Sequence, residues 1–524
     1  MLKTVPRLFM VLLLLTAFTA VGQKKATPAP KAKKQPNILV IFSDDHALRA
    51  ISAYGNSLVQ TPNIDRLAKS GMLFRNAMVT NSICGPSRAV LLSGKYSHLN
   101  GVATNQAGVA FDGSQTTFPK LLQQAGYQTA IVGKWHLVSN PTGFHYWKVL
   151  PGQGQYYNPD FVSAAGRERK EGYVTDLITD EALGWLDQKR DKSKPFLLMY
   201  QQKSPHRNWH PATRHLNLYD DVTFPEPATL FDNYANRASG ARNQEMEIDR
   251  HMELFDDNKL FQPKDSAVAP GPRYGLYGRM LPSQWVPFYK AYEDENAKFL
   301  ANPPTGKDLV RWKYQRYIKD YMRSVASLDE GIGKVLDYLK ENGLEENTLV
   351  VYSSDQGFYL GEHGWFDKRW MYEESLHTPL IVRWPGVVKP GTQNKDIVLN
   401  LDLAQTFLQA AGVAEPAEMQ GHSLLPLLKG QTPKDWRQAM YYHYSEYPRP
   451  HRVPEHFGIR NQQHKLIYYY YLKEWEFFDL KRDPQELKSE YTNPAYAATI
   501  KEMKQQLSKL QAQYKDPIAS KIAF

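Results

Sequence analysis

Four short apolar runs in the chain each end in a cluster of polar residues. They are NILVIFSDDH (37–46), YQTAIVGKWH (127–136), KPFLLMYQQKSPH (194–206) and NTLVVYSSDQGF (347–358). Continuous apolar runs of this length are typical of strands that are covered on both faces, as in parallel α/β sheets. We therefore predict four buried strands whose carboxyl ends carry polar side chains.

Amphipathic stretches alternate with these runs and predict helices over residues 61–71, 117–127, 174–188 and 314–343. Alternating strands and helices predict an α/β fold with a large sheet between helices, in which ligands bind outside the carboxyl ends of the strands. All four polar clusters lie at such ends, so we expect them to converge on one site. Chance loop composition explains any one cluster but not all four.

Two parts of the chain depart from this alternation of strands and helices. Residues 207–310 are rich in Pro, Tyr, Trp and Asn, and they predict an irregular insertion over the site, with or without short helices. Surface padding and a substrate-facing role are both open for this insertion.

The C-terminal part of the chain predicts a separate subdomain. After a catalytic domain over 36–430, the aromatic-rich residues 431–524 predict a smaller α+β subdomain with a short antiparallel sheet. It includes a hairpin at 465–480 and a closing helix at 497–515. Its tyrosines either pack a sheet face or stack on sugars.

The N-terminal residues predict export. Lys3 and Arg7 precede an apolar run that is too short to span a bilayer, and small residues follow it, which is the layout of a cleavable signal peptide over 1–22. A buried first helix is the alternative. Residues 23–35 are basic, rich in Pro and Ala, and predict a flexible leader. No later segment reaches the roughly 18 apolar residues of a membrane helix, so we expect no membrane insertion and a location in the periplasm of a Gram-negative bacterium or outside the cell.

Composition adds three constraints. Hydrophobic residues make up 42% and charged residues 23% of the chain, as in ordinary globular proteins. The net charge of +10 favours anionic ligands, but no basic stripe or nucleic-acid motif occurs, so we expect no nucleic-acid partner. Cys84 is the only cysteine, which excludes an intramolecular disulfide.

Asp44, Asp45 and Asp355, together with the amide of Gln356, are candidate metal ligands at the strand ends. Hard oxygen ligands favour Ca²⁺ or Mg²⁺ over Zn²⁺. Without a cation, three clustered carboxylates would repel one another. A helix cap or a turn is the alternative role for any one of these aspartates.

Cationic and proton-transferring groups are expected around that metal. The candidates are Arg88, Lys134, His136, His206 and Lys368. Lys and Arg stabilise charge on a transferring oxyanion, and His moves protons. Lys134 and His136 occupy alternate positions after a strand, so both can face the same side. For each candidate, a solvated surface position is the alternative.

Cys84 precedes the predicted helix SRAVLLSG, and two roles are open for it. It is a thiolate nucleophile, activated at the start of the helix, or it is a buried structural cysteine. An ordinary Cys–His hydrolase gains nothing from a carboxylate-bound cation beside its thiolate. A structural cysteine does not explain the Pro86 and Arg88 that follow. Residue chemistry alone does not decide between the two roles.

The stretch CGPSRAVLLSG resembles the signature C-x-P-S-R of the type I sulfatases. In that family a dedicated maturation enzyme oxidises the cysteine to Cα-formylglycine before folding. The resemblance extends through GKWHL, SPH, SSDQGFYLGEHGWFDK and TPLIVRWPG to FFDLKRDPQE, and so covers nearly the whole mature chain. It implies the alkaline phosphatase-like α/β fold, with a large mixed sheet between helices, and an enzyme that hydrolyses sulfate esters.

The resemblance also implies a set of ligands for Ca²⁺. They are Asp44, Asp45, Asp355, Gln356 and the formylglycine formed from Cys84. Gln356 stands where many sulfatases have Asn. An amide oxygen still suits a hard cation, but the longer side chain can shift the geometry of the site.

The implied reaction begins when a hydroxyl of the hydrated aldehyde attacks sulfur, while Arg88, Lys134 and Lys368 neutralise the sulfate oxygens. His206, aided by Lys368, then protonates the leaving alcohol. His136 takes a proton from the second hydroxyl, so that sulfate is expelled without hydrolysis of a stable ester. Each role is carried over from the family to the matching residue of this sequence.

The stretch SDQGFYLGEHGWFDKRWMYEESLHTPL is similar to bacterial sulfatases that act on N-acetylglucosamine 6-O-sulfate in heparan sulfate, heparin or related glycans. The similarity implies that Asp367 and Arg369 hold sugar hydroxyls; a structural ion pair is the alternative. His443, His451 and His456 are further candidates for the same subsite.

Other functions remain open at this point. The sulfate ester could lie on another sugar position, such as the 2-position of a uronate or the 6-position of galactosamine. A phosphodiesterase or phosphonate hydrolase of the same superfamily is a second enzyme class. An exported glycan-binding module is the non-enzymatic alternative. The expected partners are a sulfated saccharide and the enzyme that generates formylglycine.

Overall fold

The computed structural model describes residues 1–2, 35–55, 57–262, 272–518 and 522. Apart from residues 1–2 and 35, the predicted signal peptide (1–22) and leader (23–35) lie outside the described residues. The strands are β1 (Asn37–Ser43), β2 (Met72–Phe74), β3 (Ala77–Met78), β4 (Gln128–Lys134), β5 (Tyr146–Leu150), β6 (Asp160–Ser163), β7 (Gly166–Arg169), β8 (Phe196–Gln201), β9 (Thr348–Ser354), β10 (Leu380–Arg383), β11 (Thr392–Asn394), β12 (Val398–Leu399), β13 (Ala439–Tyr444), β14 (His456–Asn461), β15 (His464–Tyr469) and β16 (Glu474–Asp479). The α-helices are α1 (Pro62–Lys69), α2 (Cys84–Ser93), α3 (Ser97–Asn100), α4 (Phe118–Gln124), α5 (Val174–Gly184), α6 (Gly240–Asn243), α7 (Pro282–Ala301), α8 (Gly306–Glu341), α9 (Glu373–Leu376), α10 (Leu403–Ala410), α11 (Leu425–Leu428) and α12 (Ala497–Gln513).

A ten-stranded sheet has the strand order β11-β2-β10-β9-β1-β8-β4-β5-β6-β7. Strands β9, β1, β8, β4 and β5 are parallel, whereas β10 on one side and β6 on the other are antiparallel to their neighbours. The four predicted apolar runs are the adjacent strands β9, β1, β8 and β4, so their carboxyl ends lie along one edge. The predicted fold class, a large mixed sheet between helices, is confirmed.

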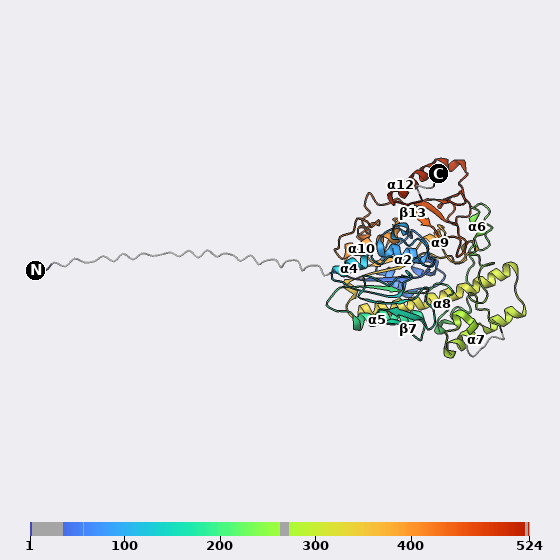
Figure 1. Cartoon of the computed structure of the whole chain (residues 1–524), viewed down its shortest axis with the longest axis horizontal. Helices are drawn as coiled ribbons and strands as arrows, with labels where there is room; N and C mark the ends of the chain where they lie inside the picture. The colour runs from blue at the N-terminus through green and yellow to red at the C-terminus, as the bar shows by residue number, and fades with distance from the viewer. Residues whose placement is uncertain (3–34, 56, 263–271, 519–521, 523–524) are drawn as a thin grey trace. The chain divides into compact units, whose positions relative to one another are not determined.

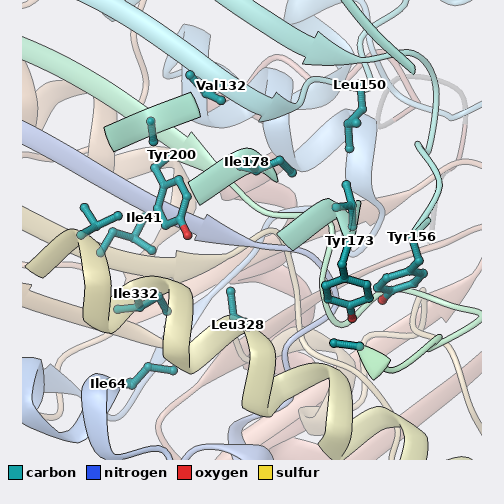
Figure 2. Close-up of a cluster of buried hydrophobic side chains, with 14 of the residues drawn as sticks. Ile41, Ile64, Val132, Leu150, Tyr156, Tyr173, Ile178, Tyr200, Leu328 and Ile332 are labelled. Atoms are coloured by element: carbon teal, nitrogen blue, oxygen red, sulfur yellow. The ribbon is translucent and has the colours of Figure 1, made fainter. Parts of the chain in front are cut away.

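The two faces of the sheet bury different side chains of the same strand. Leu39 and Ile41 of β1 belong to a cluster with side chains of α1, α5 and α8, and Figure 2 shows Ile41 near Ile332 of α8. Val40 and its alternate neighbours pack instead with α2, α4 and α10. Figure 1 shows α5 and α8 on one side of the sheet and α2, α4 and α10 on the other. Each fully buried Leu or Ile contributes roughly 1.5–3 kcal/mol, and this two-sided burial explains why the runs are continuously apolar.

The predicted irregular insertion over residues 207–310 is only partly irregular, because α7 is a regular helix of 20 residues. Its buried side chains recur at three- and four-residue spacing: Trp285, Phe288, Tyr289, Tyr292, Asn296 and Phe299. The prediction was wrong here because Pro287 and many polar residues hide that period. Pro287 lies in the second turn of α7, where its missing N–H removes one backbone hydrogen bond and the helix continues.

The smaller sheet is antiparallel, in the order β13-β14-β15-β16, and α12 packs against it. The predicted hairpin is β15–β16, and the predicted closing helix is α12. Tyr441, Tyr442 and Tyr469 are fully buried, so packing occupies the faces that a sugar would need. The domain boundary at residue 431 stays a prediction. In the described part of the chain, no helix combines the length and the apolar character needed to cross a membrane.

Candidate active site

Three carboxylates meet where β1 and β9 end. The two strands pair in parallel register to their last residues, so the residues that follow them leave the sheet together. Carboxylate oxygens of Asp44, Asp45 and Asp355 lie within 4.8 Å of one another. The backbone N–H of Asp45 donates to Oδ1 of Asp355 at 3.0 Å. The structure therefore brings the three predicted carboxylates together, and Gln356 follows directly.

These side chains are fully buried and incompletely paired. Burial and the charge of Asp44 raise the pKa of Asp355 to about 7. Oδ1 of Asp44 and Oε1 of Gln356 have no hydrogen-bond partner among the described residues. Buried oxygen lone pairs without donors are costly, and a hard cation that prefers carboxylate and amide oxygens satisfies them. The donor set therefore fits Ca²⁺ or Mg²⁺.

Each of the three carboxylates also contacts one of the predicted cationic residues. The pairs are Arg88–Asp355 (2.9 Å), Lys134–Asp44 and Lys368–Asp45 (2.8 Å). Arg88 comes from α2, Lys134 ends β4, and Lys368 lies in the loop after β9. All three cations are buried, so little water screens their charge. They concentrate positive charge around the carboxylates, which is the kind of charge that stabilises an oxyanion.

The two predicted histidines lie at the same site. His206 has Nδ1 at 2.7 Å from the carbonyl oxygen of Arg207, so Nδ1–H donates there. Its Nε2 then faces Oδ2 of Asp45 at 3.8 Å. Nδ1 of His136 is buried and has no partner within the described ranges. Burial, followed by the charge of Lys134, lowers the pKa of both histidines, and a bound anion would raise both values again.

Cys84 is the first residue of α2 and is 1% exposed. Burial raises the pKa of its thiol to about 12, so the unmodified side chain is a neutral thiol, which is a poor nucleophile. The next residue, Gly85, donates its N–H to Oδ1 of Asn105 at 3.0 Å. A Cβ at position 85 would lie 2.5 Å from that oxygen, so a larger residue there would displace the Asn105 side chain.

We call these residues the central cluster. Its members are Asp44, Asp45, Cys84, Arg88, Lys134, His136, His206, Asp355, Gln356 and Lys368.

A second group, which we call the Asp367 cluster, adjoins it and consists of Asp367, Arg369, Glu446 and His451. Its contacts are Arg369 Nε–Asp367 Oδ1 at 3.2 Å, His451 Nε2–Asp367 Oδ2 at 3.2 Å and Arg369 Nη1–Glu446 Oε1 at 2.8 Å. Asp367 and Arg369 are 5% exposed and have φ values of +77° and +94°, in the left-handed region that non-glycine residues seldom adopt. Such strain concentrates at binding and catalytic sites.

Of the three histidines named from the sequence, His451 alone contacts Asp367. His443 instead pairs with Asp516 at 2.7 Å, and Nδ1 of His456 lies 2.7 Å from the carbonyl oxygen of Pro454. Neither therefore belongs to the Asp367 cluster.

Comparison with known proteins identifies the family of the chain. Residues 36–413 match the sulfatase family, and residues 361–513 match the family described as N-sulphoglucosamine sulphohydrolase, C-terminal. The chain belongs to the sulfatase family. Sulfatases are sulfuric ester hydrolases, so the chain is an enzyme of that class.

Three relatives of this sulfatase show how far the similarity extends. It is 48% identical to an N-acetylglucosamine-6-O-sulfatase of Bacteroides thetaiotaomicron over 498 residues, which are 94% of this chain and 89% of that protein. It is 27% identical to the N-acetylglucosamine-6-sulfatase of Capra hircus, over 79% of this chain and 67% of that protein. A solved structure in complex with its substrate D-glucosamine-2-N,6-O-disulfate is 48% identical, with a TM-score of 0.89 over 92% of this chain and 99% of that one.

The sulfatase site also contains residues that sequence reasoning did not select. Glu446 and Asn105 carry no pattern that would point to them, because each is defined by contacts with residues far away in the chain. Lys203 does carry such a pattern. It stands in the polar cluster after β8 together with His206. Only the structure, in which it is 3% exposed, distinguishes it from a surface lysine.

Proposed function

We propose that this sulfatase hydrolyses the 6-O-sulfate ester of N-acetylglucosamine or N-sulfated glucosamine units in heparan sulfate, heparin or related glycans. The observation that carries the proposal is the 48% identity, over 94% of the chain, to an N-acetylglucosamine-6-O-sulfatase. The complex with glucosamine-2-N,6-O-disulfate, at the same identity and a TM-score of 0.89, supports the same sugar.

We propose Ca²⁺ as the metal, held by Asp44, Asp45, Asp355, Gln356 and residue 84. The unpaired oxygens of Asp44 and Gln356, and the raised pKa of Asp355, support a divalent cation at this point. When bound, the ion supplies positive charge that lowers the energy of a sulfate oxygen as negative charge develops there.

We propose that Cys84 is converted to Cα-formylglycine by a maturation enzyme. The C-x-P-S-R motif supports this, as does the neutral, buried state of the unmodified thiol. Because Cys84 is 1% exposed, a modifying enzyme must reach it before the chain folds. The formylglycine supplies, as a hydrate, a nucleophilic hydroxyl in place of the thiol.

The chain's own residues then bind the sulfate and move protons. Arg88 and Lys134 are placed to neutralise sulfate oxygens, because both are buried beside the carboxylates. His206 is positioned by its Nδ1–H donation to the backbone, so Nε2 is the atom that delivers a proton to the leaving alcohol, with Lys368 close by. The unpaired Nδ1 of His136 is free to accept a proton in the step that releases sulfate.

Asp367 and Arg369 are proposed to bind hydroxyls of the sugar that carries the sulfate. Both are buried beside Lys368, where little water solvates them, so an epimer whose hydroxyl cannot hydrogen-bond to them should bind less tightly.

We also propose export, on the pattern of residues 1–22. N-terminal sequencing of protein from the periplasmic fraction tests it.

Sulfate release from a panel of 6-O-, 2-O- and N-sulfated sugars tests the function. We expect N-acetylglucosamine 6-sulfate to be preferred, and a preference for uronate 2-sulfate would contradict the assignment.

Two further experiments test the proposed formylglycine and metal. Mass spectrometry of the Cys84 peptide should show the loss of mass that accompanies replacement of CH₂SH by CHO. Chelation should abolish turnover, and added Ca²⁺ should restore it.

A further inference from the structure

A cavity of about 410 Å³ opens beside His206, and the function proposed above assigns a role to none of its other lining side chains. Among the residues that line it are Gln153, Gln155, Tyr156, Lys203, Arg207 and Glu253. Arg207 and Glu253 also line a second hollow of about 710 Å³, which contains His451 of the Asp367 cluster. The two hollows therefore share part of their lining. A glycan whose sulfated sugar contacts the Asp367 cluster can place a neighbouring sugar in the cavity beside His206.

Lys203 is the conspicuous group in this cavity. It is 3% exposed, and none of the described residues forms an ion pair with its ammonium or accepts a hydrogen bond from it. The centroid of the Tyr156 ring lies 4.9 Å from Nζ. The other buried lysines of the described chain have carboxylate or carbonyl partners: Lys134, Lys148, Lys259, Lys313, Lys368 and Lys465.

The missing partner has an energetic consequence. A buried ammonium without an acceptor loses most of its hydration, and contact with an aromatic ring replaces only part of it. Burial, followed by the charge of Lys134, accordingly lowers the pKa of Lys203 to about 7. An anionic group beside Nζ would remove this penalty through a charge-assisted hydrogen bond.

The cavity also holds unsatisfied acceptors. Oε1 of Gln153 and Oε1 of Gln155 are buried and have no donor within the described ranges. Sugar hydroxyls supply donors of the kind that these oxygens lack. Glu253 and Asp256 at the lining add two negative charges, which disfavour a ligand with several anionic groups.

We propose that this cavity is a second saccharide subsite, which binds a pyranose carrying one carboxylate, that is, a uronic acid linked to the sulfated amino sugar. Its carboxylate pairs with Lys203, and its hydroxyls donate to Gln153 and Gln155. The inference rests on the proposed function, because it places the second sugar relative to the one that loses sulfate.

The test compares two disaccharides that differ in one group. In one, N-acetylglucosamine 6-sulfate is linked to glucuronic acid; in the other it is linked to glucose, which has a hydroxymethyl group in place of the carboxylate. We expect kcat/KM of the wild-type enzyme to be about tenfold or more higher for the acidic disaccharide, as for a charged hydrogen bond. Lys203→Met should bring this ratio to about one, and Lys203→Arg should retain part of it. As a matched variant, Gln155→Leu should lower kcat/KM for both disaccharides by the same factor and leave the ratio intact.

A wild-type ratio of one overturns the proposal. So does a Lys203→Met variant that loses the same factor on both disaccharides and on the monosaccharide, because Lys203 would then serve the sulfate itself. Turnover of the monosaccharide by the wild type tests the proposed function separately. If no substrate is turned over, calorimetric titration with the unsulfated acidic disaccharide decides: equal binding by the wild type and Lys203→Met, or binding by neither, contradicts the subsite.

Discussion

The central cluster and the Asp367 cluster are neighbours, but the fold assembles them differently. The aspartates of the central cluster follow directly from parallel strands, and β1 and β9 set their spacing through backbone hydrogen bonds. The Asp367 cluster joins loops that are far apart in the chain. Glu446 lies 77 residues after Arg369, and His451 lies 84 residues after Asp367. The sheet therefore positions the aspartates proposed to bind the metal, whereas mutual ion pairs hold the groups proposed to select the sugar. This division allows a family to keep one chemistry while its loops change the substrate.

Removal of the nucleophile should have the largest effect. Cys84→Ala takes away the group proposed to be converted to formylglycine, so kcat should fall by about 10⁴-fold or more on every sulfate ester, whatever the sugar. Steady-state sulfate release measures this. The thermal midpoint of the variant is the control and should stay within a few degrees of the wild type. Residual turnover near the wild-type rate would contradict a role for residue 84 in the reaction.

Replacement of the proposed proton donor should come next. His206→Gln should lower kcat by about 10²–10³-fold on a sugar sulfate, because the alkoxide then leaves without a proton. On an aryl sulfate, whose phenolate leaves readily, the same variant should lose far less. The ratio of the two losses is the measurement. Equal losses on both substrates would mean that His206 binds sulfate and does not protonate the leaving group.

Cys84 and His206 could be named as candidates from the sequence because each stands in a local pattern. An apolar run that ends in Asp44 and Asp45 gives both the strand and the site, since a parallel sheet aligns the ends of its strands. The roles of Cys84 and His206 came from a family resemblance that covers contiguous residues. The local pattern suffices wherever one strand end contributes the chemistry.

Glu446 is a residue of the site that no local sequence pattern predicts. It is buried at 1% exposure, yet its neighbours along the chain, Ser445 and Tyr447, give no reason to expect an acid in the site. Its role depends on the distance to Arg369, which only the packing of the small sheet against the loop after β9 defines. Helix α7 was missed for a different reason. Its apolar period is present, but Pro287 and the polar residues between the apolar positions conceal it.

The loop that carries the Asp367 cluster also contains His363, whose protonation should make the stability of the protein depend on pH. Burial opposes the charge of His363, but the hydrogen bond to Asp232 and then the negative charge of Glu374, whose Oε2 lies 3.8 Å from Nε2, outweigh it and raise the pKa to about 9. A folded-state pKa above the usual 6.5 stabilises the protein fully below about pH 6.5, and this stability is lost as the pH rises through 9. The loss should reach about 3 kcal/mol.

Denaturant unfolding of the wild type and of His363→Gln at several pH values measures this contribution. The difference in the free energy of unfolding between the two proteins should be largest near pH 6 and should shrink towards pH 10. Other titrating groups are common to both proteins, so they cancel in the difference to a first approximation. A difference that does not change with pH would show that His363 is not charged in the folded protein.

The smallest expected effect tests whether the two clusters are independent. Oε1 of Glu446 accepts from Arg369 at 2.8 Å, and Oε2 accepts from the backbone N–H of Asn105, whose own side chain accepts from Gly85 beside the nucleophile. Glu446→Gln removes one charged acceptor from this chain, so kcat/KM on the sugar sulfate should fall by about tenfold, as for one charged hydrogen bond. Glu502→Gln, on the exposed face of α12, is the matched control and should change nothing. If the Asp367 cluster acts alone, an aryl sulfate will be turned over at the wild-type rate. If the contact through Asn105 positions the start of α2, the aryl sulfate will lose activity as well. We expect this second result because the backbone N–H of Gly85, directly beside residue 84, donates to the Asn105 side chain at 3.0 Å.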